Sequence, residues 1–518
     1  MTVAFVRLRL LNFPLERDEG EYAYAGQLIL QGIPPYELAY NMKFPGTYLA
    51  YAFIMALFGQ TPAGIHFGIL CLTTGSALML YWLGKKMLDE VAGAVTAISF
   101  VIFTASPFML GLAGHATHFA AFFVIAGLCL MQKTKQNFSQ RTVFAAGTLF
   151  GAAILMKQHA IIIAAWALMA LEVQNFQKTR KFNLRHFTLP GIFGLGAALP
   201  FLLCCGWLVA MGVFGKFWFW TINYARAYVS ISSLTDSKAA FARMGSWLFS
   251  TTFPWWPLVV VAMIWLWMDK RLIPIRFRLS GFFIASVLTV FPGFYFRQHY
   301  FLLVLPAAAL LIGCSVSSLR RLGEKKWPHS LWRGWPLFAF SFFLAATISV
   351  NFEIWFKVPL PETVRLVYGS DTLLEGQSAG KLIRAHSSPS DKVAILGSEP
   401  EIYFIARRHS ATGYIYVYPL METQPFARQM QDEMIQEIET NAPTFIVYAH
   451  NFASWMKNPD SDPHIFNWWD DYQTNYTLVG IVDSAAPDHE IWGESAVAAY
   501  GNQVRGFGFA IYQRKTMR

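Results

Sequence analysis

The sequence predicts a polytopic α-helical membrane protein with about 10–11 transmembrane helices, followed by a small extracytoplasmic α/β domain. Of its 518 residues, 55% are hydrophobic and only 14% are charged. This composition supplies more apolar surface than a soluble domain needs. Apolar runs long enough to cross a hydrocarbon core of about 30 Å recur between residues 63 and 352. After residue 353 the pattern changes to short strand-like and helix-like runs.

The candidate transmembrane helices are closed by short polar or basic turns. They are residues 63–84, 91–109, 116–131, 142–156, 158–174, 188–213, 247–267, 280–294, 299–316 and 334–352. As one helix, 142–174 would run about 50 Å at about 1.5 Å per residue, so two helices with a turn at Lys157-Gln158-His159 fit better. Residues 1–15 are too short for a full span, and we expect an incomplete first helix there.

Positive charge collects in alternate connections, which the positive-inside rule places in the cytoplasm. These residues are Lys85, Lys86, Lys133, Lys135, Lys178, Arg180, Lys181, Arg185, Lys270, Arg271, Arg276, Arg278, Arg320, Arg321, Lys325 and Lys326. The net charge of +10 is therefore a topology signal, and no nucleic acid partner is expected. The first loop, the turns near His115, Lys157 and Arg297, the loop 214–246 and the tail are then extracytoplasmic, in a cell inner (plasma) membrane.

The tail contains four strand-like runs, VAILGS, TFIVYAH, TLVGIVDS and FGFAIYQR. Two helix-like runs, PEIYFIARR and FARQMQDEMIQEIETN, separate them and indicate an α/β domain. It shows no glycine-rich phosphate loop or nucleophile motif, which favours an accessory or acceptor-facing module. We expect three parts: a truncated first helix with the first loop and interfacial helices (1–62), a transmembrane helical domain (63–352) and the α/β domain (353–518).

Ionisable residues are dense just ahead of the first complete span. Residues 17–24 read RDEGEYAY and residues 41–46 read NMKFPG, so an acidic cluster and a lysine flank one loop. Asp18, Glu19 and Glu21 could simply solvate the start of a surface helix, where acids favour the helix dipole. The tyrosines among them suit a helix lying in the headgroup plane, and nearby prolines stiffen the loop around Lys43.

RDEGEYAYAGQLILQGIPPYELAYNMKFPG resembles the first extracytoplasmic loop of the GT-C glycosyltransferases. It is most similar to the protein O-mannosyltransferase family (glycosyltransferase family 39) and its bacterial relatives, including the lipid A aminoarabinose transferases. In that group an Asp-Glu pair opens the loop and a Lys-Pro-containing motif closes it, before a short interfacial helix like TYLAYAFIMALFG. ILMKQHA, RQHYFLLVLPAAALLIG and ILGSEPEIYFIARR also resemble the group.

The resemblance implies a membrane glycosyltransferase of the cell envelope. It would move a sugar from a polyprenyl-phosphate-linked donor to a hydroxyl of a lipid, glycan or protein acceptor, by inverting displacement. Asp18 is then the candidate base that takes the acceptor proton, and Glu19 is its positioning or coordinating neighbour. A cation beside the departing phosphate lowers the barrier, which is the role expected for Lys43, Lys157 and Arg297.

Other outer residues are candidate substrate or acceptor contacts. They are Glu21, Tyr22, His115, His118, His159 and His299. His115 and His118, three residues apart, could also hold a divalent metal ion. No cofactor is certain. The alternative is that the two histidines are polar residues that line a cavity. Related sequences often have an acid near His118. For Lys157 and Arg297 the alternative is snorkelling at a helix end.

Two other classes of protein compete with the transferase. A polytopic lipid or sugar transporter or flippase would place ionisable residues on broken helices near the bilayer midplane, whereas these spans are nearly charge-free. A non-catalytic membrane protein could use the tail to bind a partner. The aromatic run KFWFWTINYARAYVS either borders a lipid groove or forms an interfacial aromatic belt.

Overall fold

A computed structural model describes residues 2–134, 139–179, 185–231, 234–251, 255–327, 331–369, 372–486 and 490–515. The chain forms two compact units. Unit 1 comprises Met1–Leu10, His66–Gly206 and Ser232–Val358, and unit 2 comprises Leu11–Ile65, Trp207–Ile231 and Pro359–Arg518. This grouping by contact joins the first loop to the tail. The division by chain order into 1–62, 63–352 and 353–518 stays a prediction.

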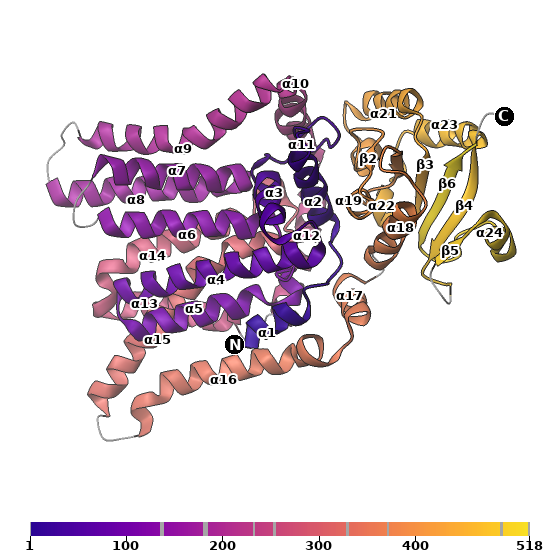
Figure 1. Cartoon of the computed structure of the whole chain (residues 1–518). Helices are drawn as coiled ribbons and strands as arrows, with labels where there is room; N and C mark the ends of the chain where they lie inside the picture. Colours follow the sequence, from indigo (N-terminus) through magenta and orange to yellow (C-terminus); the bar gives the residue numbers. More distant parts are fainter. Residues whose placement is uncertain are drawn as a thin grey trace. The chain divides into compact units, whose positions relative to one another are not determined.

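Unit 1 is helical, and its long helices run side by side (Figure 1). The helices around and within it are α1 (Thr2–Arg9), α4 (Pro62–Met87), α5 (Glu90–Thr104), η1 (Pro107–Met109), α6 (Ala116–Thr134), α7 (Gln140–Met156), η2 (Gln158–Ala160), α8 (Ile161–Thr179), α9 (Arg185–Ala210), α12 (Leu234–Thr251), α13 (Trp255–Met268), η4 (Lys270–Leu272), α14 (Ile273–Leu288), η5 (Pro292–Phe294), η6 (Gln298–Leu303), α15 (Leu305–Lys326), η7 (Leu331–Gly334), α16 (Trp335–Val350) and η8 (Glu353–Lys357). Within the part of the chain that the structure describes, five helical segments are long and apolar enough to cross a membrane, and shorter apolar helices accompany them. The chain is a multi-pass membrane protein.

Most of the predicted spans correspond to a helix, including the break at Lys157, where α7 ends at Met156 and α8 begins at Ile161. Three predicted spans are displaced. Within the described residues, the span 247–267 is shared by α12, which ends at Thr251, and α13, which starts at Trp255. The span 280–294 is replaced by α14, which starts at Ile273. The span 299–316 is replaced by α15. α14 and α15 include basic residues, which hydropathy had placed outside the spans. Such residues can belong to these helices because their alkyl stems cover apolar surface while their charges reach water.

Three of the basic clusters meet at one end of unit 1. Asp89 accepts a hydrogen bond from the amide of Ala92 at 2.8 Å, which caps α5, and it pairs with Arg321 at 2.7 Å. The carboxylate of Asp269 pairs with Arg271 at 2.9 Å, and Arg271 also donates to a carbonyl of α15. The basic residues at the C-terminal ends of α4 and α15 and just after α13 therefore share one end, as charge alternation predicted. Lys135, Arg180 and Lys181 lie outside the described residues.

The tail of unit 2 forms a six-stranded sheet in the order β2-β1-β3-β6-β4-β5. The strands are β1 (Lys392–Leu396), β2 (His409–Ser410), β3 (Phe445–His450), β4 (Tyr476–Asp483), β5 (Glu490–Trp492) and β6 (Gly508–Arg514). β1 pairs in parallel with β2 and β3, whereas β6 is antiparallel to β3 and β4, and β5 is antiparallel to β4. The four predicted strands are confirmed. β2 and β5 have only two and three residues, too few to show an alternating pattern.

Helices from three parts of the chain complete unit 2. They are α2 (Arg17–Leu30), α3 (Gly46–Phe58), α10 (Phe214–Trp218), η3 (Phe219–Tyr224), α11 (Ala225–Ile231), α17 (Leu360–Tyr368), α18 (Leu373–Ala385), α19 (Glu401–Ala406), α20 (Tyr418–Met421), α21 (Ala427–Asn441), α22 (Phe452–Trp455), α23 (His464–Tyr472), η9 (Gln473–Asn475) and α24 (Glu494–Tyr500). Trp220 and Tyr224 pack with Tyr40 and Tyr414 in the hydrophobic core. For these two residues neither the lipid-groove nor the aromatic-belt interpretation holds, because they are buried in protein.

Candidate active site

The acidic cluster is built on the first turn of α2. Glu16 is the N-cap and accepts a hydrogen bond from the amide of Glu19, while Glu19 accepts one from the amide of Glu16. This reciprocal pair is a capping box, which fixes where the helix begins. Asp18 and Glu21 then lie three residues apart on one face of the helix. The structure therefore places Glu19, which is fully buried, in the helix cap.

Lys43 links the other two acids. Its Nζ lies 2.7 Å from Oδ1 of Asp18 and 2.6 Å from Oε2 of Glu21, and 4.6 Å from the centroid of the Tyr22 ring. The Glu21 carboxylate is fully buried and also accepts a hydrogen bond from the Tyr48 hydroxyl, whereas the side chain of Asp18 is 26% exposed. Glu21 thus anchors the lysine, and Asp18 keeps access to solvent.

The electrostatics of this cluster follow from its burial. Burial raises the pKa of Glu21, and the ammonium of Lys43 opposes that rise. Burial also raises the pKa of Glu16 well above its usual value, with the charges of Asp18 and Glu19 adding to the effect. Burial would lower the pKa of Lys43, but the attraction of Asp18 and Glu21 holds that pKa well above its usual value. Lys43 is therefore a fixed cation at neutral pH.

A second face of α2 lies on the C-terminal α/β part of the same unit. The residues on this face follow helical spacing: Arg17, Gly20, Tyr24, Gln27 and Gln31. Arg17 donates to the carbonyl of Ala453 at 2.9 Å, and the amide of Ser410 donates to the Tyr24 hydroxyl at 2.7 Å. Gln27 donates to the Phe404 carbonyl at 3.5 Å, and Gln31 pairs with His409 at 2.6 Å.

Two glycines of α2 allow these close approaches. A Cβ atom at Gly20 would lie 2.6 Å from the amide nitrogen of Glu401, and one at Gly26 would lie 2.9 Å from the amide nitrogen of Ala52 in α3. Real Cβ atoms do not approach backbone so closely. The helix is therefore held between α3 on one side and α19 on the other, with its acidic face directed at Lys43.

Unit 1 contains a separate cluster of predicted residues. The rings of His115 and His299 lie 4.3 Å apart between centroids, and His299 contacts Tyr300 at 4.9 Å. The His159 ring lies 5.1 Å from Tyr300, and Nζ of Lys157 lies 4.6 Å from the same ring. Three turns far apart in the sequence thus meet around Tyr300. We call these residues the histidine cluster.

The remaining predicted residues of unit 1 border this group. The His118 ring lies 6.5 Å from that of His115. The guanidinium of Arg297 lies 5.8 Å from the Tyr295 ring, and Nδ1 of His159 is 3.0 Å from the carbonyl of Thr289. The roles assigned to all of these residues from the sequence remain predictions.

Sequence reasoning missed several residues of the site in unit 2. Glu16 and Tyr48 were overlooked, because neither belongs to the quoted acidic or lysine motif. The run YIYVY at 414–418 carries a tyrosine at every second position, a signal that could have drawn attention to Tyr416. The Tyr416 ring lies 5.9 Å from Nζ of Lys43.

The apolar helices of unit 1 make the chain a multi-pass membrane protein, and unit 2 carries an acidic helix and a lysine on an α/β tail. The family model for dolichyl-phosphate-mannose-protein mannosyltransferases matches residues 43–204. No curated protein matches by sequence.

Solved structures give the more particular likeness. The structure is similar to ArnT from Cupriavidus metallidurans bound to undecaprenyl phosphate, with a TM-score of 0.58 and 14% identity, over 99% of this chain and 96% of that one. For apo ArnT the TM-score is 0.55 at 15% identity, over 98% and 95% of the two chains. The fold likeness and the family-model match together confirm the predicted GT-C fold and the predicted class, a glycosyltransferase.

Proposed function

We propose that the chain transfers a sugar from a polyprenyl-phosphate-linked donor to a hydroxyl acceptor, at the outer face of a cell inner (plasma) membrane. One observation carries the proposal: of the acids at the start of α2, Asp18 keeps solvent access and lies 2.7 Å from the half-buried cation Lys43. The bound undecaprenyl phosphate of the similar ArnT structure and the lipid-linked mannose donor in the matching family's name support this class of donor.

The proposed reaction is an inverting displacement. The acceptor hydroxyl gives its proton to the carboxylate of Asp18 as its oxygen attacks the anomeric carbon. The bond from that carbon to the phosphate oxygen breaks, and polyprenyl phosphate leaves with the electron pair. Lys43 offsets the charge that develops on the phosphate. Because Glu21 also binds Lys43, the lysine stays in place when Asp18 turns to the acceptor.

Residues of unit 1 complete the proposal. Lys157 and Arg297 are further phosphate contacts, and the histidine cluster contacts sugar or acceptor. The basic residues around Asp89 lie at the cytoplasmic end of unit 1 by the positive-inside rule. The sites and the α/β domain are then extracytoplasmic. The acceptor is a lipid, glycan or protein.

A divalent metal ion is a separate proposal. Imidazole nitrogens suit several transition metals, and the rings of His115 and His299 are adjacent in unit 1. These two side chains would hold the ion, and the ion would help bind the phosphate oxygens. Full transfer activity after treatment with EDTA would remove the metal from the proposal.

The deciding experiment replaces the base. Asp18→Asn, in proteoliposomes supplied with a polyprenyl-phosphate sugar and an acceptor, should transfer at least about 100-fold more slowly than the unaltered protein. The matched control is Asp432→Asn on α21, whose 54%-exposed side chain pairs with Arg428. Full activity of Asp18→Asn would refute the base assignment. Movement of substrate across the bilayer without glycosidic bond formation would support the transporter alternative.

A further inference from the structure

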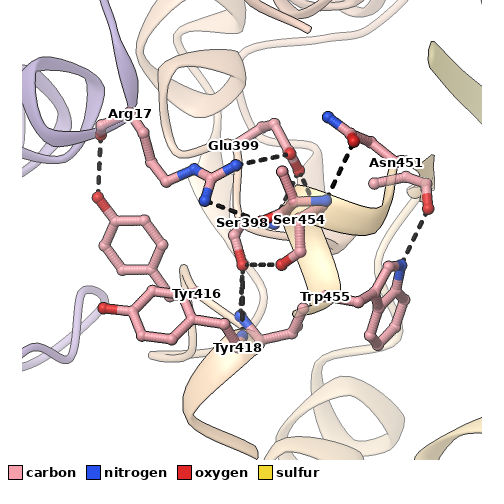
Figure 2. A network of polar contacts seen from close by, with 11 residues as sticks. Arg17, Ser398, Glu399, Tyr416, Tyr418, Asn451, Ser454 and Trp455 are labelled. Carbon is pink, nitrogen blue, oxygen red and sulfur yellow. Dashed lines mark hydrogen bonds and ion pairs between the residues drawn. The ribbon is translucent and has the colours of Figure 1, made fainter. Parts of the chain in front are cut away.

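Ser398 lies at the centre of a buried network in the α/β part of unit 2 (Figure 2). Its hydroxyl donates to the Ser454 carbonyl at 2.5 Å and accepts from the amides of Val417 and Tyr418 at 3.1 and 3.4 Å. Its own amide donates to Oγ of Ser454 at 2.8 Å and to Oε2 of Glu399 at 2.7 Å. One side chain therefore ties the loop after β1 to α22 and to the start of α20.

The same network reaches the first turn of α2. Nη2 of Arg17 lies 3.8 Å from Oε1 of Glu399, and Figure 2 shows its guanidinium pointing toward that carboxylate. The backbone carbonyl of Arg17 accepts a hydrogen bond from the Tyr416 hydroxyl at 2.9 Å. Arg17 precedes Asp18 directly, so these contacts fix the backbone from which the proposed base projects.

The network also places two tyrosines beside the acidic cluster. The Tyr416 ring lies 5.9 Å from Nζ of Lys43 and 5.4 Å from the Tyr418 ring. Tyr416 is buried and its hydroxyl donates a hydrogen bond to the Arg17 carbonyl, whereas Tyr418 is half-buried. Among the described residues, no hydrogen-bond partner is found for the Tyr418 hydroxyl. Burial raises the pKa of Tyr418, Lys43 opposes the rise and nearby carboxylates add to it. The phenol therefore stays protonated and can donate.

We propose that the α/β part completes the active site, with Tyr418 as a hydrogen-bond donor to a sugar hydroxyl or phosphate oxygen of the substrates. Ser398 and Glu399 act as positioning residues that hold Arg17 and the Tyr416–Tyr418 turn. The inference rests on the proposed function, because it takes Asp18 and Lys43 as the reacting centre. It changes the expected role of the tail from an accessory or acceptor-facing module to part of the site itself.

The substrate contact is tested with Tyr418→Phe, which removes only the hydroxyl. Loss of one hydrogen bond to a charged or polar ligand should raise one KM by about 3- to 30-fold, while kcat changes by less than about 2-fold. A change in the donor KM identifies the phosphosugar as the ligand, and a change in the acceptor KM identifies the acceptor. Tyr512→Phe on β6 is the matched control. Two unchanged KM values would overturn the contact.

The positioning role is tested with Glu399→Gln, which keeps the shape of the side chain but removes the charge facing Arg17. We expect kcat to fall by about 5- to 20-fold through misplacement of the base, with both KM values unchanged. Arg17→Lys should retain more activity than Arg17→Met. Wild-type kcat in Glu399→Gln would overturn the positioning role.

The outcomes separate this inference from the proposed function. If Asp18→Asn is inactive while Tyr418→Phe and Glu399→Gln behave as wild type, only this inference fails. If Asp18→Asn is fully active, Asp18 is not the catalytic base and the proposed function fails.

Discussion

The acidic cluster of unit 2 and the histidine cluster of unit 1 are held together by different forces. Lys43, Asp18 and Glu21 are joined by ion pairs in a largely buried setting. The histidine cluster is held by ring contacts around Tyr300, on turns between apolar helices. Breaking a buried ion pair costs about 3–5 kcal/mol, whereas an aromatic contact contributes about 0.5–1.5 kcal/mol. The first cluster is preorganised by charge, and the second can rearrange around a ligand.

The largest expected effect comes from removing the cation of the acidic cluster. Lys43→Met leaves the carboxylate of Glu21 buried without its ammonium partner, so the protein should lose about 3–5 kcal/mol of stability together with its transfer activity. The measurements are thermal unfolding in detergent and sugar transfer. The double variant Lys43→Met/Glu21→Gln should recover most of the stability but no activity. An unchanged Tm in the single variant would contradict the comparison.

The corresponding cation of the histidine cluster should separate stability from activity. Lys157→Gln loses the contact with the Tyr300 ring, which lies 4.6 Å from Nζ. Because a ring contact contributes less than a buried ion pair, its Tm should fall less than that of Lys43→Met. If Lys157 binds phosphate, kcat/KM should fall by about 10- to 100-fold, and Lys157→Arg should recover part of it. A loss of stability as large as that of Lys43→Met would remove the distinction between the clusters.

A third variant tests how tightly the acidic helix is packed. Gly20→Ala should destabilise unit 2 by about 1–3 kcal/mol, because the new Cβ would meet the backbone of Glu401. Gly215→Ala in α10 is the control, since a Cβ there meets nothing within 4 Å. The measurement is thermal unfolding of both variants. Equal Tm values would show that α2 can move away from α19.

A change in pH should have an effect on stability similar to that of Gly20→Ala. Burial raises the pKa of Glu422 from 4.5 to about 7, although a hydrogen bond from Tyr224 lowers it. The folded state therefore binds the proton more tightly than the unfolded state, so stability should fall by about 1–3 kcal/mol as pH rises from 4.5 to 7 and level off above 7. In Glu422→Gln this dependence should be absent from Tm measured against pH. Identical pH profiles would exclude Glu422 as its source.

Hydropathy and charge were sufficient to predict most helices, because burial in lipid depends on runs of neighbouring residues. The α/β tail was predictable because β1, β3, β4 and β6 carry β-branched and aromatic residues in short runs. The predicted boundaries of α14 and α15 were wrong, because basic residues extend these helices beyond their apolar runs.

The candidate site was predictable only in part. The first-loop motif identified Asp18 and Lys43, but it could not show that Glu21 is buried and Asp18 partly exposed, since this depends on Tyr48 of α3. The face of α2 that carries Arg17 and Tyr24 has no apolar periodicity. Its partners lie about 380 to 440 positions later in the chain, where local patterns cannot reveal them.

The long separation between α2 and its partners has a consequence for biosynthesis. Arg17 leaves the ribosome more than 400 residues before Ala453, to which it donates a hydrogen bond. Until the tail has been made and has folded, α2 lacks the surface that fixes its first turn. A nascent chain already inserted in the membrane therefore cannot hold Asp18 in its final position, and the enzyme gains its proposed activity only after Ala453 and the strands around it have been made and have folded.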